Sequence, residues 1–224
     1  IGADGARSRV RELVFGTGKQ FEKYLGYYVA AFHLPNHYGL EKNFITYQRP
    51  GRSVLLYPLD KKHIDVTFIF SSPNVGFVPL EKQHAMLHSA FSSDQDVVKQ
   101  ILKDIPQNAP LFFDSLTQIR LPEWSKGRVA LIGDACGCLT LAAGQGSHMA
   151  MAGAYVLHNE FMRHNSDHTA AFGAYEKTLH PIINKKQTES AKFGNVFLTL
   201  LPALGPLYHA LLRASFHPLF IHET

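Results

Sequence analysis

The stretch from Gly127 to Glu160 limits the possible folds of this chain more than any other part of the sequence. It starts with a short apolar run from Val129 to Ile132, which is bounded by glycines and predicts a buried strand. Gly133 and Asp134 follow at the carboxyl end of that strand. After a loop of small residues, Gly144 to Ser147 opens a segment with the apolar spacing of a helix.

This order of elements predicts a ligand-binding site where the strand gives way to the helix. The carboxylate of Asp134 can accept hydrogen bonds from sugar or polyol hydroxyls, and Gly133 lets a ligand approach the backbone. The first turn of the helix offers backbone N–H groups and the positive end of the helix dipole. We therefore expect a ligand that is anionic or becomes anionic during a reaction.

Two motifs in this chain resemble those of a known family. Gly2 to Arg11, GADGARSRVR, resembles the motif G-A-D-G-x-x-S-x-V-R of the group A flavoprotein monooxygenases, the family of para-hydroxybenzoate hydroxylase. Gly133 to Ser147 resembles their second flavin-contacting motif, in which G-D-A precedes a loop and a G-x-G at a helix start. The segment from Cys136 to Leu157 is similar to the tetracycline-inactivating branch of that family, the tetracycline destructases.

The resemblance implies an α/β (α+β) fold that is the C-terminal part of a Rossmann-like FAD-binding domain, with an inserted antiparallel β-sheet domain and C-terminal helices. Residues 1–18 and 112–178 would form the FAD-binding part, residues 19–111 the substrate-binding sheet domain, and residues 179–224 a C-terminal helical segment. The family's early G-x-G-x-x-G motif is absent, and the sequence starts at Ile1. We therefore expect the N-terminal FAD-binding portion of the same protein to lie upstream.

The resemblance also implies an oxidoreductase, a flavoprotein monooxygenase. In the family, NAD(P)H reduces FAD, and a flavin hydroperoxide formed with dioxygen hydroxylates an aromatic or polyketide-like small molecule. In the tetracycline-inactivating branch, this hydroxylase reaction gives antibiotic resistance. Two alternatives stay open: a flavin-dependent reductase without oxygen transfer, and a non-catalytic fragment that lacks the N-terminal FAD half.

The two motifs also carry over the expected cofactor contacts. Asp134 would hold the ribityl chain, and the backbone N–H groups of Gly146, Ser147 and His148 would face the negative charge of reduced flavin. The residues of the first motif would lie near the flavin and the nicotinamide path, although Asp4 could equally cap the following helix. The expected cofactor-binding residues are Asp134, Gly133, Gly144, Gly146, Ser147, His148, Asp4 and Arg7.

The flavin loop departs from the family pattern in two ways. The family usually has prolines here beside the reacting face of the flavin, whereas this chain has Leu139, Thr140 and Leu141. Gly137 stands where the family often has a histidine. Both changes could reshape the cavity, so the substrate of a phenol hydroxylase does not transfer to this chain.

The region from Phe21 to Phe70 is rich in aromatic and β-branched residues that alternate as strand faces do. Turn signals separate its strand-like runs and predict an antiparallel meander, with runs at residues 27–33, 43–48, 53–57 and 64–70. In the resembling family this sheet covers the substrate above the flavin.

Aromatic residues of this sheet could stack on a flat, conjugated substrate. The candidates are Tyr28, Phe32, Phe44, Tyr47 and Phe68. For each one a place in the core is the alternative. His33 is the polar candidate on the other face of the strand.

The remaining segments predict packing elements. Residues 111–121 form a strand that returns to the FAD-binding part, Trp124 is a packing anchor, and Pro181 kinks the chain between two helices. The predicted helices are at residues 80–91, 94–103, 167–178, 182–201 and 207–216. The apolar segment at 196–212 is interrupted by prolines and barely long enough to span a membrane, so packed helices are expected there.

Composition narrows the partners and the location. The balance of 22 basic and 18 acidic residues gives a net charge of +4 without a basic run, which argues against a nucleic-acid partner. Cys136 and Cys138 have the spacing of neither a disulfide framework nor a zinc site, and the 13 histidines form no metal motif. We expect a cytoplasmic protein without a bound metal.

Overall fold

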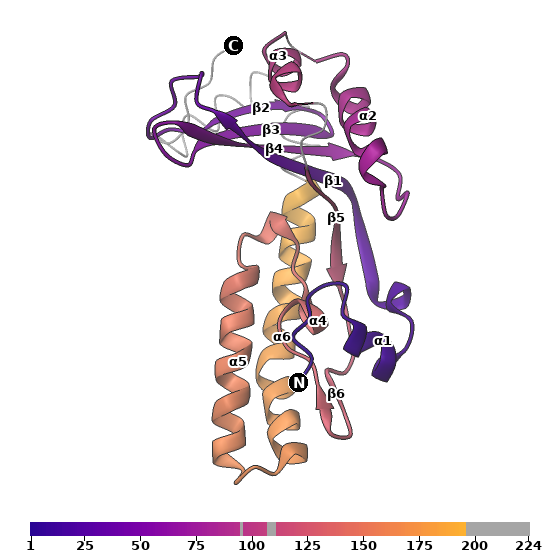
Figure 1. Cartoon of the computed structure of the whole chain (residues 1–224). Coiled ribbons are helices and arrows are strands. Elements are labelled where there is room, and N and C mark those ends of the chain that lie inside the picture. The colour runs from indigo at the N-terminus through magenta and orange to yellow at the C-terminus, as the bar shows by residue number, and fades with distance from the viewer. Residues whose placement is uncertain (95, 107–110, 196–224) are drawn as a thin grey trace. The chain divides into compact units, whose positions relative to one another are not determined.

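The computed structural model describes residues 1–94, 96–106 and 111–195 (Figure 1). The chain forms two compact units. Unit 1 consists of Ile1–Leu25 and Leu116–Gly194, and unit 2 contains Gly26–Ser115.

Unit 2 is built on a five-stranded sheet with the strand order β2-β3-β4-β1-β5. The strands are β1 (Glu22–Pro35), β2 (Ile45–Arg49), β3 (Arg52–Pro58), β4 (His63–Ser71) and β5 (Phe112–Ile119), close to their predicted positions. Residues 22–25 of β1 and 116–119 of β5 belong to unit 1. The predicted meander holds only for β2, β3 and β4, because β1 pairs antiparallel with β4. This central place suits β1, since its run from Tyr27 to Ala30 is continuously buried.

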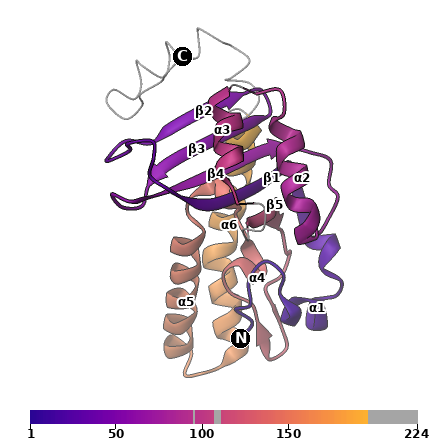
Figure 2. The ribbon, with the colours of Figure 1, turned by 45° about the horizontal axis from the view of Figure 1, so that its top comes forward.

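Two helices of unit 2, α2 (Leu80–Phe91) and α3 (Asp96–Asp104), lie over one face of its sheet (Figure 2). Phe91 of α2 is fully buried and meets the ring of Phe68 from β4 edge-on, with ring centroids 5.0 Å apart. The buried residues of α3 are Val98, Ile101 and Leu102. Both helices therefore have the packing role predicted for them.

Unit 1 combines a short parallel strand pair with a hairpin and helices. Gly2 forms a parallel bridge with Leu131, directly after the hairpin of β6 (Ser125–Lys126) and β7 (Val129–Ala130). The helices are α1 (Arg9–Phe15), α4 (Asp134–Gly137), α5 (Gly146–Arg163) and α6 (His168–Asn195), with 3-10 turns η1 (Gly18–Phe21) and η2 (Leu141–Ala143). The predicted strand and the predicted helix start of the central motif are confirmed.

The core of unit 1 forms around Trp124, which is only 2% exposed. Its ring lies 5.5 Å from that of Tyr175 and 5.0 Å from that of His180, both from α6. Leu131 and Leu157 belong to the same buried cluster, which joins the strand to α5. Trp124 is therefore the packing anchor that the sequence predicted.

The two helices predicted on either side of Pro181 are one helix. α6 runs without interruption over 28 residues and contains Pro181. Proline lacks the N–H of one helical hydrogen bond, but buried contacts on both sides of it, at Leu179 and Ile183, keep the segment packed on the core. The predicted helix at 207–216 and the apolar segment at 196–212 lie outside the described residues.

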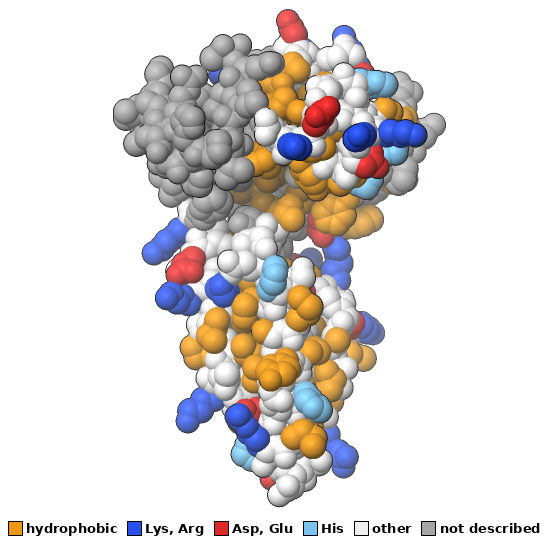
Figure 3. Space-filling view, turned by 90° about the vertical axis from the view of Figure 1, so that its left-hand side faces the viewer, with side chains coloured by type: hydrophobic (Ala, Val, Ile, Leu, Met, Phe, Trp, Pro, Cys, Tyr) orange, Lys and Arg blue, Asp and Glu red, His pale blue; other side chains and the backbone are white. Residues whose placement is uncertain are grey.

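The helix α5 has one buried side and one exposed side. Gly153, Leu157 and Glu160 are buried. Met151, Tyr155 and Met162 are 63%, 69% and 68% exposed, and Figure 3 shows hydrophobic side chains gathered over this part of the molecule. Among the described helices, none combines the length and apolar character needed to cross a membrane.

Candidate cofactor-binding site

The two sequence motifs meet in unit 1 through a parallel strand pair. The N–H of Gly2 donates to the carbonyl of Ala130 at 2.8 Å, and the N–H of Ile132 donates to the carbonyl of Gly2 at 2.9 Å. A Cβ atom on Gly2 would lie 2.6 Å from Leu131 Cδ2 and 2.9 Å from Val10 Cβ, so the space between these two residues favours glycine. Asp4 and Asp134 therefore follow two neighbouring extended segments that pair in parallel through one bridge, a position where α/β domains bind their ligands.

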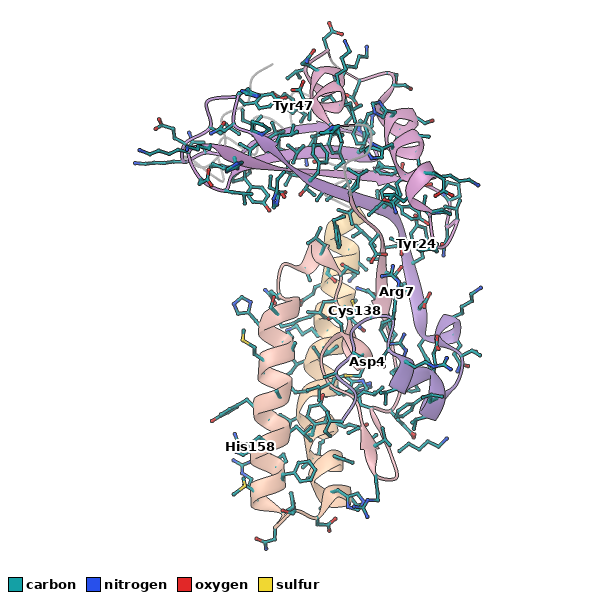
Figure 4. All side chains as sticks on the ribbon, viewed as in Figure 1. Asp4, Arg7, Tyr24, Tyr47, Cys138 and His158 are labelled. Carbon is teal, nitrogen blue, oxygen red and sulfur yellow. The ribbon has the colours of Figure 1, made fainter. Side chains whose placement is uncertain are left out.

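Ser8 is the N-cap residue of α1, and Asp4 adds to the cap by satisfying N–H groups of the first turn, as the alternative interpretation proposed. The Asp4 carboxylate accepts from the Ser8 hydroxyl at 2.5 Å and from the backbone N–H groups of Arg9 at 2.7 Å and Val10 at 3.1 Å. Desolvation acts to raise the pKa of Asp4, but these hydrogen bonds prevail and lower it. Asp4 and Arg7 are both exposed and precede α1, so contact with a ligand is compatible with the cap (Figure 4).

Arg11, the last residue of the first motif, is buried and connects the two motifs. The side chain is 1% exposed, and its guanidinium donates to the carbonyl of Ala135 at 2.9 Å and to that of Ala6 at 2.6 Å. Burial lowers the pKa of Arg11. The residue joins the first motif to the second, and its place as the last residue of the first motif was the signal for this role.

Gly133 and Asp134 form the turn between the strand and α4. Gly133 has φ 63° and ψ −139°, and a Cβ there would lie 3.2 Å from Ala150 Cβ in α5. Asp134 is exposed. Desolvation raises the pKa of its carboxyl group, and a hydrogen bond with Cys138, which acts to lower this pKa, is the weaker effect. A Cβ on Gly146 would lie 4.0 Å from Asp134 Oδ1, so this carboxylate faces the first turn of α5.

The first turn of α5 is open to a ligand. Gln145 occupies the N-cap position, but its side chain makes no capping hydrogen bond and instead accepts one from Lys186. Gly144 precedes it in the left-handed conformation, with φ 61°. The first residues of the helix, Gly146, Ser147 and His148, thus present backbone N–H groups that favour an anion.

A narrow crevice connects these elements. Its lining combines one acidic residue and several glycines with apolar side chains, and the lining residues are Trp124, Gly133, Asp134, Cys136, Gly137, Leu139, Gly146, Met149, Ala150, Gly153, Tyr175, Leu179 and Ile183. Glycines at the turn, an acidic group and an open helix start fit a ligand with polyol hydroxyls and an anionic edge, as FAD has. No cluster of potential metal ligands occurs among the described residues.

The aromatic candidates of unit 2 mostly lie in the core of its sheet. Tyr28, Phe32 and Phe68 are 1%, 7% and 0% exposed, on the sheet face covered by α2. Phe44 and Tyr47 are partly buried. The structure thus gives the first three the packing role that was their alternative.

The opposite face of the same sheet carries a row of polar residues, of which only His33 was singled out from the sequence. His33, Asp65 and Tyr57 are direct cross-strand neighbours on β1, β4 and β3. His33 Nε2 lies 3.3 Å from Asp65 Oδ1, and the Thr67 hydroxyl donates to Asp65 Oδ2 at 2.8 Å. Burial raises the pKa of Tyr57. The negative charge of Asp65 and its hydrogen bond with Tyr57 raise that pKa further. Because alternate strand residues face opposite ways, the sequence pattern could have found this row once the helix-covered face was known.

Paired parallel segments that are followed by acidic residues beside an open helix start are typical of nucleotide-binding α/β domains. The chain belongs to the family of FAD-binding domains, whose family model matches residues 1–189.

Flavin-dependent monooxygenases are among the proteins similar to this chain. One from an unknown prokaryotic organism is 34% identical over 190 residues, which cover 84% of this chain and 49% of that protein. Another, from Legionella longbeachae, is 30% identical over 197 residues, covering 87% of this chain and 50% of that protein. The chain thus spans about half the length of these relatives.

Solved structures show the same fold. The tetracycline destructase Tet(51) superimposes with a TM-score of 0.78 at 30% identity, covering 88% of this chain and 54% of that protein. HpxO of Klebsiella pneumoniae, complexed with FAD and uric acid, gives a TM-score of 0.77 at 24% identity, covering 96% and 55% respectively. The predicted α/β fold and the resemblance to group A FAD monooxygenases are confirmed.

Proposed function

We propose that the whole protein is an FAD-dependent monooxygenase that uses NAD(P)H and dioxygen to hydroxylate an aromatic or polycyclic small molecule. The observation that carries this proposal is the position of the Asp134 carboxylate against the open first turn of α5. The flavin-dependent monooxygenases similar to this chain support the reaction type.

The residues of unit 1 would bind and orient the flavin. Asp134 would accept hydrogen bonds from ribityl hydroxyls, while the N–H groups of Gly146, Ser147 and His148 would stabilise negative charge on the ring. Bound FAD would supply the redox chemistry, accepting electrons from NAD(P)H and activating dioxygen. Asp4 and Arg7 would lie along the path of the nicotinamide donor.

The remainder of the FAD site would come from the part of the whole protein outside this sequence. The relatives are about twice as long as the part that matches this chain. We assign the adenosine and pyrophosphate of FAD to that portion, and we expect the protein to work in the cytoplasm.

Unit 2 would supply the substrate-binding surface. The row of His33, Asp65 and Tyr57 offers two exposed polar groups held by one buried carboxylate, with Asp65 5% and Tyr57 41% exposed. Such groups can donate to and accept from the hydroxyl and carbonyl oxygens of an aromatic polyketide. The likeness to the tetracycline destructases Tet(51) and Tet(55), at 30% and 25% identity, supports a tetracycline as the first substrate to test.

The test is oxygen consumption by the full-length protein purified with its flavin. We expect FAD to copurify, and tetracycline to stimulate both NAD(P)H oxidation and oxygen uptake, with a product heavier by one oxygen atom. Stimulated NAD(P)H oxidation without oxygen uptake, with a product that has gained two hydrogen atoms, would identify a reductase instead. Absence of bound flavin would refute the proposal as a whole.

A further inference from the structure

Thr140 has a backbone conformation that threonine rarely adopts. It lies between α4 and α5 with φ 85° and ψ 160°, a region that is occupied almost only by glycine. A β-branched residue there is strained, and strain of this kind persists only where the surrounding structure imposes it. Strained residues concentrate at binding sites, so Thr140 calls for a physical explanation.

The hydroxyl of Thr140 is also unusual. Its Oγ1 atom is buried and finds no hydrogen-bond partner among the described residues. Leaving a buried hydroxyl without a partner costs about 1 to 3 kcal/mol. Valine has nearly the same shape and would avoid this cost, so packing alone does not explain threonine at this position.

A buried polar network holds the loop that leads to Thr140. Gln187 is 1% exposed and donates to the carbonyl of Cys138 at 3.0 Å and to that of Ile119 at 2.7 Å. The Ser190 hydroxyl lies 3.3 Å from the carbonyl of Leu139. Two consecutive carbonyls before Thr140 are therefore fixed by side chains of α6.

Gln118 of β5 completes this network. It is fully buried, and its amide nitrogen donates to the carbonyl of Gln187 at 2.7 Å and to the Ser190 hydroxyl at 3.1 Å. Its amide oxygen accepts two hydrogen bonds from Arg120, at 3.0 and 2.7 Å. Buried amides with this many partners rigidify a segment, and here the segment is the one before Thr140.

The fixed loop borders the cofactor crevice. Leu139, the neighbour of Thr140, lines the crevice together with Asp134 and Gly146. On its other side, the carbonyl of Thr140 accepts from the N–H of Ala143 at 3.2 Å, in the turn that leads to α5. Thr140 thus lies between a residue that lines the crevice and the turn that leads to α5.

We propose that Thr140 is a cofactor-contacting residue whose hydroxyl forms a hydrogen bond with the isoalloxazine ring of the flavin, and that Gln118, Gln187 and Ser190 are the residues that position it. This inference rests on the proposed function, because it requires bound FAD. It explains the strained backbone, the unpartnered hydroxyl and the buried network together.

The test compares Thr140→Val with Thr140→Ser in the full-length protein. Valine keeps the branched shape and removes the hydroxyl, whereas serine keeps the hydroxyl. We expect valine to weaken FAD binding about fivefold, the effect of losing one hydrogen bond, and to shift the visible absorption bands of the flavin. Serine should retain the wild-type spectrum and affinity.

A second measurement separates this role from packing. Without FAD, Thr140→Val should raise the melting temperature, because it removes an unpartnered buried hydroxyl. With FAD, the stabilisation that the cofactor gives should be smaller than in the wild type. Thr140→Ala replaces valine in both measurements if the valine variant does not fold, and Thr178→Val, which removes an exposed hydroxyl of α6, is the control that should change neither.

Three outcomes would overturn the inference. A valine variant with the wild-type spectrum and FAD affinity would show that the hydroxyl does not contact the ring. Equal changes in the valine and serine variants would show that shape, and not the hydroxyl, matters. A wild-type protein that binds no flavin would overturn the proposed function together with this inference, whereas the first two results leave that function intact.

Discussion

The two units place their functional groups in different ways. In unit 1 the candidate site consists mainly of backbone groups, glycines and one carboxylate, and close approaches such as those of Gly2 to Leu131 and Val10 favour glycine. In unit 2 the candidate surface consists of side chains on one face of a sheet. The alternating sequence pattern does not indicate which of the two faces would bind a ligand. A site built from backbone leaves a readable motif, whereas a site built from strand side chains does not.

The largest expected effect tests the core assignment in unit 2. Phe68→Ala should destabilise the protein by about 3 to 5 kcal/mol, because Phe68 is fully buried against Phe91. Tyr47→Ala should cost clearly less, since Tyr47 is only partly buried. Denaturant unfolding measures both. Wild-type stability of the Phe68 variant combined with weaker substrate binding would restore Phe68 as a substrate residue.

The next effect tests the tight packing of unit 1. Gly137→His introduces the residue that the resembling family often has, but a Cβ here would lie 2.8 Å from Ile183 Cγ2 and 3.4 Å from Trp124 Cζ2. We expect a loss of stability of about 1 to 3 kcal/mol or more from overpacking. Gly173→Ala, which has no atom within 4 Å of the new Cβ, is the control and should not destabilise. A stable histidine variant would show that the crevice is wider than described.

A smaller effect tests the polar row of unit 2. Asp65→Asn keeps the shape of the side chain but weakens its hold on His33 and Tyr57, so KM for the substrate should rise about fivefold. FAD content should not change, because no cofactor role is assigned to unit 2. Asp60→Asn removes an exposed carboxylate from the same unit and should leave KM as it is. Unchanged KM in both variants would remove the row from the substrate surface.

The smallest effect concerns pH and Asp4. Because the folded pKa of Asp4 is lowered, the unfolded chain takes up this proton first as the pH falls. The stabilisation by Asp4 is therefore fully present above about pH 4, the ordinary range of an aspartate, and is lost below it as the pH falls through the lowered pKa. The stability difference between wild type and Asp4→Asn should shrink over that range. A difference that is constant from pH 7 to pH 3 would contradict the capping role.

The sequence predicted the elements well where local patterns determine them. The strands of unit 2, the helices α2 and α3, and the start of α5 at Gly146 all follow from periodicity, turns and glycines. The place of β1 beside β4 did not follow, because pairing depends on which strand can bury both faces. Pro181 inside α6 was misread as a break, since packing on either side outweighed the local preference.

The site was only partly predictable for a similar reason. Asp134 and the open helix start belong to a contiguous motif, so the sequence revealed them. The burial of Arg11 and the network of Gln118 and Gln187 include contacts between residues far apart in the sequence: 124 positions separate Arg11 from Ala135, and 68 separate Gln187 from Ile119. No spacing in the sequence encodes such contacts, which exist only once the fold has formed.

The central claim is that the Asp134 carboxylate and the first turn of α5 hold the flavin. Its most direct test is the FAD dissociation constant of the full-length Asp134→Ala variant, measured by flavin fluorescence and compared with Glu189→Ala, which removes an exposed carboxylate of α6. Losing hydrogen bonds to a charged group should weaken FAD binding about tenfold or more in the Asp134 variant alone. Equal FAD affinity in the wild type and both variants would contradict the account.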